Sequence, residues 1–164
     1  LKGRYVDTSQ ENFRRTMDVS CYSFTAVASH ASKMMVNGGS LLSLSFYGAE
    51  KVMPNYNVMG VAKAALEASI RYLASDLGSM NIRVNGISAG PMRTLAGSAI
   101  GGARHILRRS QEVAPLRRSL CQEDIGGGAL YLLSDLSQSV TGEIQHIDSG
   151  YNAIGMSIGD SEQS

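Results

Sequence analysis

The segment that decides the fold reads Asn55-Tyr-Asn-Val-Met-Gly-Val-Ala-Lys-Ala-Ala-Leu66. An apolar stripe at helical spacing continues to Gly78, so we expect a long helix that begins at Asn55 or Tyr56. Tyr56 and Lys63 are seven positions apart, which in a helix leaves them roughly 20° out of alignment, on one face. A phenol beside an ammonium group suits the stabilisation of negative charge. The spacing alone fits two interfacial side chains of an amphipathic helix at least as well.

Helices and short apolar strands alternate on both sides of this segment, a pattern typical of a parallel sheet covered on both faces. No strand is followed by the G-x-G-x-x-G turn that holds a dinucleotide pyrophosphate. We therefore expect the second half of a larger doubly wound domain, with further strands beside residues 40–45 and a frayed tail over 157–164. The expected strands are 40–45, 82–88 and 143–147, and the other expected helices are 12–35, 104–113 and 123–133.

The composition of the 164 residues, with 18% charged residues and a net charge of +1 at pH 7, describes an ordinary soluble globular protein. No basic excess indicates a nucleic-acid or membrane surface. No apolar run approaches the roughly 20 residues that span a bilayer, and the first residues do not form a signal peptide. Cys21 and Cys121 lack metal-ligand spacing, and the three histidines are far apart, so we expect no metal site.

The motifs around the tyrosine and lysine, in their order along the chain, resemble those of the short-chain dehydrogenases. Most members of that family use Tyr-x3-Lys. The Tyr-x6-Lys spacing here is similar to that of the bacterial enoyl-acyl-carrier-protein reductases, and the resemblance runs from about Tyr5 to Met156. The stretches that carry it are Ser43-Leu-Ser45, Gly48-Ala-Glu50, Pro54-Asn55, Ile82-Arg-Val-Asn-Gly-Ile-Ser-Ala-Gly-Pro91, Ser134-Asp-Leu-Ser137, Thr141-Gly-Glu143 and Asp148-Ser-Gly150.

The resemblance implies the C-terminal part, 1–164, of a single Rossmann-like α/β domain with a doubly wound parallel sheet. It implies a role for each matching residue in reducing an enoyl thioester on acyl carrier protein. Tyr56 would stabilise the enolate formed by hydride addition from NADH or NADPH, and Lys63 would hold the nicotinamide ribose. Phe46 stands where the family has a second aromatic residue, and its ring cannot donate a hydrogen bond. The other implied cofactor contacts are Ser45, Gly90, Met92, Arg93, Thr94, Leu95 and Ala96.

The resemblance also implies a substrate lid over about 94–113 and a cytoplasmic homotetramer, with the helices 12–35 and 56–77 as its interface. Three alternatives stay open. Tyr47-Gly-Ala-Glu-Lys51 has the commoner Tyr-x3-Lys spacing, but just before Pro54 we interpret it as a loop tyrosine and a solvated lysine. Ser43, 13 residues before Tyr56, suits a carbonyl-reducing member such as a ketoacyl reductase. A piece without the pyrophosphate turn could also serve only in assembly.

Overall fold

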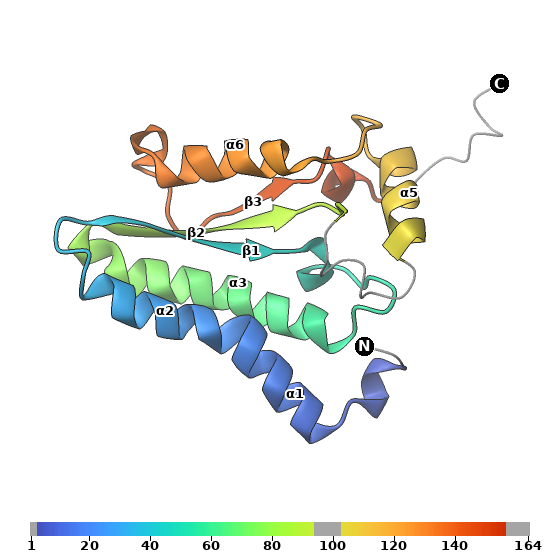
Figure 1. Cartoon of the computed structure of the whole chain (residues 1–164), viewed down its shortest axis with the longest axis horizontal. Helices are drawn as coiled ribbons and strands as arrows, with labels where there is room; N and C mark the ends of the chain where they lie inside the picture. The colour runs from blue at the N-terminus through green and yellow to red at the C-terminus, as the bar shows by residue number, and fades with distance from the viewer. Residues whose placement is uncertain (1–2, 94–102, 157–164) are drawn as a thin grey trace.

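The computed structural model describes residues 3–93 and 103–156, which form three layers (Figure 1). A sheet lies between α3, flanked by α1 and α2, on one face and α6 on the other. Helix α5 lies beside the ends toward which the strand arrows point. The helices are α1 (Gln10–Met17), α2 (Ser23–Ser32), α3 (Val58–Leu77), α5 (Ala103–Val113) and α6 (Gln122–Leu133), and the strands are β1 (Gly39–Ser45), β2 (Ile82–Ala89) and β3 (Ile144–Ile147).

The three strands of the described sheet are parallel and lie in the order β1-β2-β3. Each pair is joined by a crossover that contains a helix, α3 between β1 and β2 and α6 before β3. This arrangement confirms the expected Rossmann-like α/β fold and all three strands. β1 is an edge strand of the described sheet, and further strands beside it stay a prediction.

The core forms between α3 and β2. Ala62, Leu66 and Ile70 are buried along one stripe of α3, and each large apolar side chain buried in this way contributes about 1.5–3 kcal/mol. Gly86 of β2 lies beneath this stripe, where an added Cβ would stand 2.8 Å from Ile70 Cδ1. Because Gly86 has no side chain, the helix can lie close to the sheet. The buried face of α3 is thus the face that the sequence predicted.

The first helical stretch differs from the single helix 12–35 that the sequence predicts. Ser9 Oγ accepts a hydrogen bond from the Asn12 amide at 3.2 Å, so the stretch begins at Gln10. A π-helical segment (Asp18–Tyr22) separates α1 from α2 and places the buried Cys21 thiol 3.6 Å from Ser69 Oγ of α3. The regular helix ends at Ser32. Periodicity finds the apolar face, but it does not find a wide turn within it.

The start of α3 corrects a second expectation. Asn55 and Asn57 have φ values of 60° and 44°, in the left-handed region, which a right-handed helix cannot include. The helix therefore begins at Val58, and Tyr56 lies in the preceding turn. The prediction that Tyr56 and Lys63 share a helical face by their phase is wrong for this reason. Helices α5 and α6 begin within one residue of their predicted starts.

Candidate active site

The residues that the sequence selects lie where β1 ends and α3 begins. Ser45 is the last residue of β1, residues 46–57 form the connection, and Lys63 lies in the second turn of α3. In Figure 1 this connection lies at the arrowhead end of β1, on the same side of the molecule as α5. The carboxyl ends of parallel strands are where α/β sheets bind their ligands.

Tyr56 is held mainly by its ring. The side chain is 7% exposed, and its ring lies edge-on to Phe46, with 4.9 Å between centroids and 66° between planes. Burial raises the pKa of Tyr56 to about 12, so the hydroxyl keeps its proton at neutral pH. This hydroxyl has no hydrogen-bond partner within residues 3–93 and 103–156. Tyr56 is therefore a buried residue whose hydroxyl is available as a donor to a ligand.

Two glycines allow the close contact between the connection and α3. A Cβ on Gly48 would stand 2.4 Å from Tyr56 Cδ1 and 3.2 Å from Phe46 Cδ1, and a Cβ on Gly60 would stand 2.6 Å from the Gly48 carbonyl oxygen. Real Cβ atoms do not approach other atoms so closely. The short 3₁₀ turn Tyr47–Ala49 thus lies directly on the first turn of α3, with the Tyr56 ring against it.

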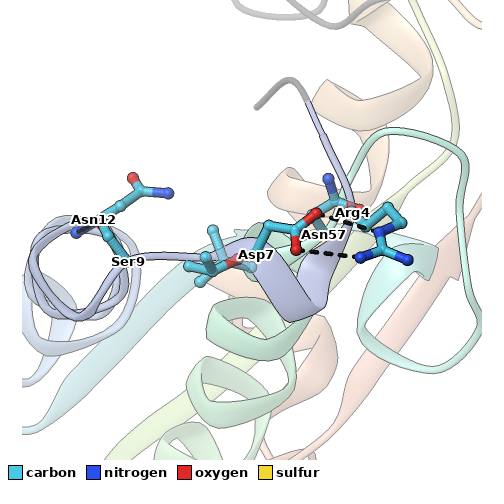
Figure 2. A pocket seen from close by; sticks show the side chains of 7 residues that line it. Arg4, Asp7, Ser9, Asn12 and Asn57 are labelled. Atoms are coloured by element: carbon cyan, nitrogen blue, oxygen red, sulfur yellow. Dashed lines mark hydrogen bonds and ion pairs between the residues drawn. The ribbon is translucent and has the colours of Figure 1, made fainter.

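A small polar hollow lies beside the turn that carries Tyr56. Figure 2 shows its lining residues, among them the ion pair in which Arg4 Nε donates to Asp7 Oδ2 at 3.1 Å. Asn57 also lines the hollow, and its Nδ2 donates to the Gly3 carbonyl oxygen at 2.7 Å. The bond from Asn57 ties the left-handed turn to the segment that precedes α1, so we interpret the hollow as structural support for the Tyr56 turn.

Lys63 extends from α3 to the end of β1. Its Nζ donates to the Leu44 carbonyl oxygen at 2.7 Å. Burial lowers the pKa of Lys63, and the nearby carboxylate of Glu67 opposes that shift. An ammonium group has three donors, and Leu44 takes one of them. The remaining donors are available at the carboxyl edge of the sheet.

Glu67 is a buried acid that sequence analysis did not select. Its side chain is 7% exposed, and it accepts a hydrogen bond from Ser45 Oγ. Burial raises the pKa of Glu67, and the Ser45 hydrogen bond opposes the shift. A signal was available, because Glu67 follows Lys63 by one helical turn and directly follows the buried Leu66.

A polar row crosses the sheet beside Glu67. Ser45 of β1 is paired with Ser88 of β2, and Ser88 with His146 of β3. Ser88 Oγ is buried without a hydrogen-bond partner among the residues described. The Nε2 atom of His146 lies 2.6 Å from Oε1 of Glu50. This contact ties the connection after β1 to β3, the far strand of the described sheet.

The implied cofactor contacts are only partly described. The Gly90 amide donates to the Ile147 carbonyl oxygen at 2.8 Å, and an added Cβ would stand 2.7 Å from Asp148 Cα, so Gly90 is packed closely on its own chain. Met92 is half-buried and Arg93 is exposed. The remaining three, Thr94, Leu95 and Ala96, lie outside the described residues, as does the first part of the expected lid.

The second tyrosine–lysine pair sits in the loop environment that the sequence predicts. Tyr47 lies in the 3₁₀ turn and Lys51 in a bend. The Tyr47 hydroxyl donates to the Asn152 carbonyl oxygen at 3.4 Å, and its ring lies edge-on to Tyr151. Asp148 caps the same C-terminal turn by accepting from the Asn152 amide at 2.8 Å.

Comparison with known proteins decides the family. Residues 1–152 match the family described as enoyl-(acyl carrier protein) reductase. The chain belongs to this enoyl reductase family. It is 65% identical over 156 residues to the NADH-dependent enoyl-acyl-carrier-protein reductase 1 of Rhizobium meliloti, covering 95% of this chain and 57% of the relative. It is 61% identical over 155 residues to the corresponding reductase of Rickettsia conorii, covering 94% and 60%.

Solved enoyl reductases have the same fold. The crystal structure of the Anaplasma phagocytophilum enoyl reductase in complex with NAD superposes with a TM-score of 0.92 and 60% identity, over 96% of this chain and 60% of that chain. The chain thus spans about three-fifths of the length of the enoyl reductases that it matches. The family match favours an enoyl reductase over the carbonyl-reducing alternative.

Within the described ranges, no helix is both long and apolar enough to cross a membrane. The same residues contain no group of three or more histidine, cysteine or acidic side chains that could hold a metal ion.

Proposed function

We propose that the intact protein, meaning the complete gene product that contains these residues, reduces the trans-2 double bond of an enoyl thioester on acyl carrier protein. NADH is the proposed cofactor, with NADPH as the alternative, and when bound it supplies the hydride. One observation carries the proposal. The protonated hydroxyl of Tyr56, which has no hydrogen-bond partner in the part of the chain that the structure describes, and the ammonium of Lys63 lie where β1 ends and α3 begins, in a chain 65% identical to an NADH-dependent enoyl reductase.

Tyr56 is the proposed donor to the thioester carbonyl. Hydride addition at the β-carbon moves negative charge onto that oxygen, and a hydrogen bond that strengthens in the transition state lowers the barrier. Its raised pKa keeps the phenol neutral, so Tyr56 stabilises the enolate as a donor. Protonation of the α-carbon then completes the reduction.

Lys63 is the proposed anchor of the cofactor ribose. The bond to the Leu44 carbonyl oxygen fixes the ammonium at the end of β1 and leaves its other donors free for ribose hydroxyls. The described residues fit this part of a dinucleotide, because polar donors converge there. Ser45, Gly90, Met92, Arg93 and the stretch 94–96 are proposed as the further cofactor contacts.

Phe46 is proposed to support the site by packing against Tyr56. Its ring lies against that of Tyr56 and has no group that could act as an auxiliary acid. Residues 94–113, which include α5, are the proposed lid over the acyl chain. The position of α5 beside the carboxyl ends of the strands supports this assignment.

The assembly is proposed to be a cytoplasmic homotetramer formed through α1, α2 and α3. Apolar side chains on this helical layer support the proposal, because Val19 and Tyr22 of the π-helical segment, Val27 of α2 and Tyr72 of α3 are all exposed in the single chain. Exposed apolar patches of this kind are typical of protein interfaces.

The function is tested by the oxidation of NADH by the intact protein, followed by absorbance, with an enoyl thioester or a 3-ketoacyl thioester as substrate. We expect oxidation with the enoyl thioester and little with the ketoacyl thioester. The opposite preference would contradict the proposal. Failure to oxidise NADH with either substrate would also contradict it, and that is the outcome for a protein that serves only in assembly.

A further inference from the structure

Glu67 and Lys63 form a paired attachment of α3 to β1. They are one helical turn apart, so their side chains lie on the same face of α3. Lys63 Nζ bonds the carbonyl oxygen of Leu44, and Glu67 accepts from the hydroxyl of Ser45, the next residue of β1. A basic and an acidic side chain thus bind consecutive residues at the end of one strand.

The burial of Glu67 is costly for stability. A carboxylate removed from water needs a partner charge or several hydrogen bonds. Among the described residues, Glu67 accepts its hydrogen bond from one neutral hydroxyl, that of Ser45. An apolar or amide side chain at position 67 would fill the same space at a lower cost in free energy. The acid therefore needs an explanation beyond packing.

We propose that Glu67 is a positioning residue whose carboxylate keeps the Lys63 ammonium protonated and bound at the end of β1, where it holds the cofactor. The inference deepens the proposed function and rests on it. Glu67 acts through Lys63 and need not touch the cofactor or the substrate.

The surrounding charges support this assignment. Burial has the largest effect on the pKa of Lys63 and lowers it. Among the groups that raise this pKa, Glu67 has the largest effect. Without that charge, the amine would lose its proton at a lower pH. The other groups that influence the pKa values of the pair are Arg71 on α3, Cys21 on the π-helical segment, Ser45 on β1, Glu50 on the connection after β1, and His146 on β3.

The test compares Glu67→Gln with Glu67→Asp in the intact protein. Glutamine keeps an acceptor for Ser45 but removes the charge, whereas aspartate keeps the charge. Trace acetylation of Lys63 with acetic anhydride across a range of pH, quantified by mass spectrometry, gives the pH at which this amine is half deprotonated. The measurement needs neither cofactor nor turnover. Asp76→Asn, which removes an exposed charge from the same helix, is the control.

We expect the Lys63 midpoint to move to lower pH by roughly one unit in Glu67→Gln, and to move much less in Glu67→Asp and Asp76→Asn. The affinity for NADH in Glu67→Gln should then fall as the pH rises, at a lower pH than in the wild type. An unchanged Lys63 midpoint in Glu67→Gln would overturn the inference. Failure of the wild type to reduce enoyl thioesters would overturn the proposed function, while the Lys63 midpoint would still be measured.

A reciprocal measurement keeps the inference testable if Glu67→Gln does not fold. Coupling between two titrating groups is mutual, so removing the lysine charge in Lys63→Gln should move the Glu67 midpoint, followed by carbon NMR of its carboxyl, to higher pH. A Glu67 midpoint that is the same in Lys63→Gln and the wild type would overturn the inference.

Discussion

The ring of Phe46 lies edge-on against the ring of Tyr56, with 4.9 Å between their centroids. Phe46 directly follows β1 and Tyr56 directly precedes the left-handed Asn57, so the contact links the strand to the start of α3. An edge-to-face aromatic pair of this kind contributes about 0.5–1.5 kcal/mol beyond its burial. The position of the Tyr56 hydroxyl therefore depends on a neighbour that cannot donate a proton.

Replacing Phe46 should thus impair turnover without impairing cofactor binding. In Phe46→Ala we expect kcat to fall by roughly 10-fold or more, because small misplacements of a catalytic group are costly. The Kd for NADH, measured by fluorescence titration, should stay close to that of the wild type. Tyr47→Phe is the control, since it keeps the ring and removes only a long hydrogen bond. A Phe46→Ala protein with unchanged kcat would show that Tyr56 does not need this support.

Gly48 gives a sharper test of the same contact. In Gly48→Ala the new Cβ would lie 2.4 Å from Tyr56 Cδ1, so the ring or the turn must move. We expect the free energy of unfolding to fall by about 1–3 kcal/mol and kcat to fall as well. Gly78→Ala is the matched control, because its Cβ would meet nothing within 4 Å. Urea unfolding measures the stability of both variants, and equal free energies of unfolding for Gly48→Ala and Gly78→Ala would contradict the packing described.

The two lysines should differ in their effect on cofactor affinity. Lys63→Ala removes an ammonium fixed at the end of β1, and the loss of hydrogen bonds from a charged group predicts a Kd for NADH that is roughly 10- to 100-fold higher. Lys51→Ala, in the bend after the 3₁₀ turn, should leave that Kd almost unchanged. The reverse order in a titration would identify Tyr47 and Lys51 as the functional pair.

The buried acid predicts a dependence of stability on pH. The pKa of Glu67 is raised in the folded protein above its ordinary value of 4.5, so the folded state binds more protons than the unfolded state above that pH. Wild-type stability should therefore fall, relative to Glu67→Gln, as the pH rises through this window. We expect similar free energies of unfolding at acidic pH and a more stable Glu67→Gln near neutrality. Urea titrations at several pH values check this, and a less stable Glu67→Gln at every pH would contradict it.

Much of the fold could be predicted because its signals are local. Apolar runs bounded by turn residues located β1, β2 and β3, and helical spacing located α5 and α6. The start of α3 could not be predicted in this way, because Asn55 and Asn57 are compatible with both a helix and a left-handed turn. Only their contacts, such as the bond from Asn57 to Gly3, select the turn.

Only part of the candidate site could be predicted, because some of its contacts join residues that are distant in sequence. Tyr56 and Lys63 were selected by their spacing together with the family resemblance, and Phe46 by the resemblance alone. In the structure Phe46 contacts Tyr56, and Lys63 binds the end of β1. Spacing alone did not reveal Glu67, because its partner Ser45 is distant in sequence. It did not reveal the Ser88 hydroxyl either, because only the folded chain shows that this group is buried without a partner among the described residues. The structure does not support a shared helical phase of Tyr56 and Lys63, because Tyr56 lies before α3, and the roles of both residues stay a proposal.

The most direct test of the central claim is the kcat of Tyr56→Phe in the intact protein, with an enoyl thioester and saturating NADH. Removing the hydroxyl leaves the ring and its contact with Phe46 in place, so stability should hardly change. If the hydroxyl stabilises the enolate, kcat should fall by roughly 10²-fold or more, as for the loss of an oxyanion donor, while the Kd for NADH stays the same. A Tyr56→Phe protein with wild-type kcat would contradict the assignment of Tyr56 as the donor to the substrate carbonyl.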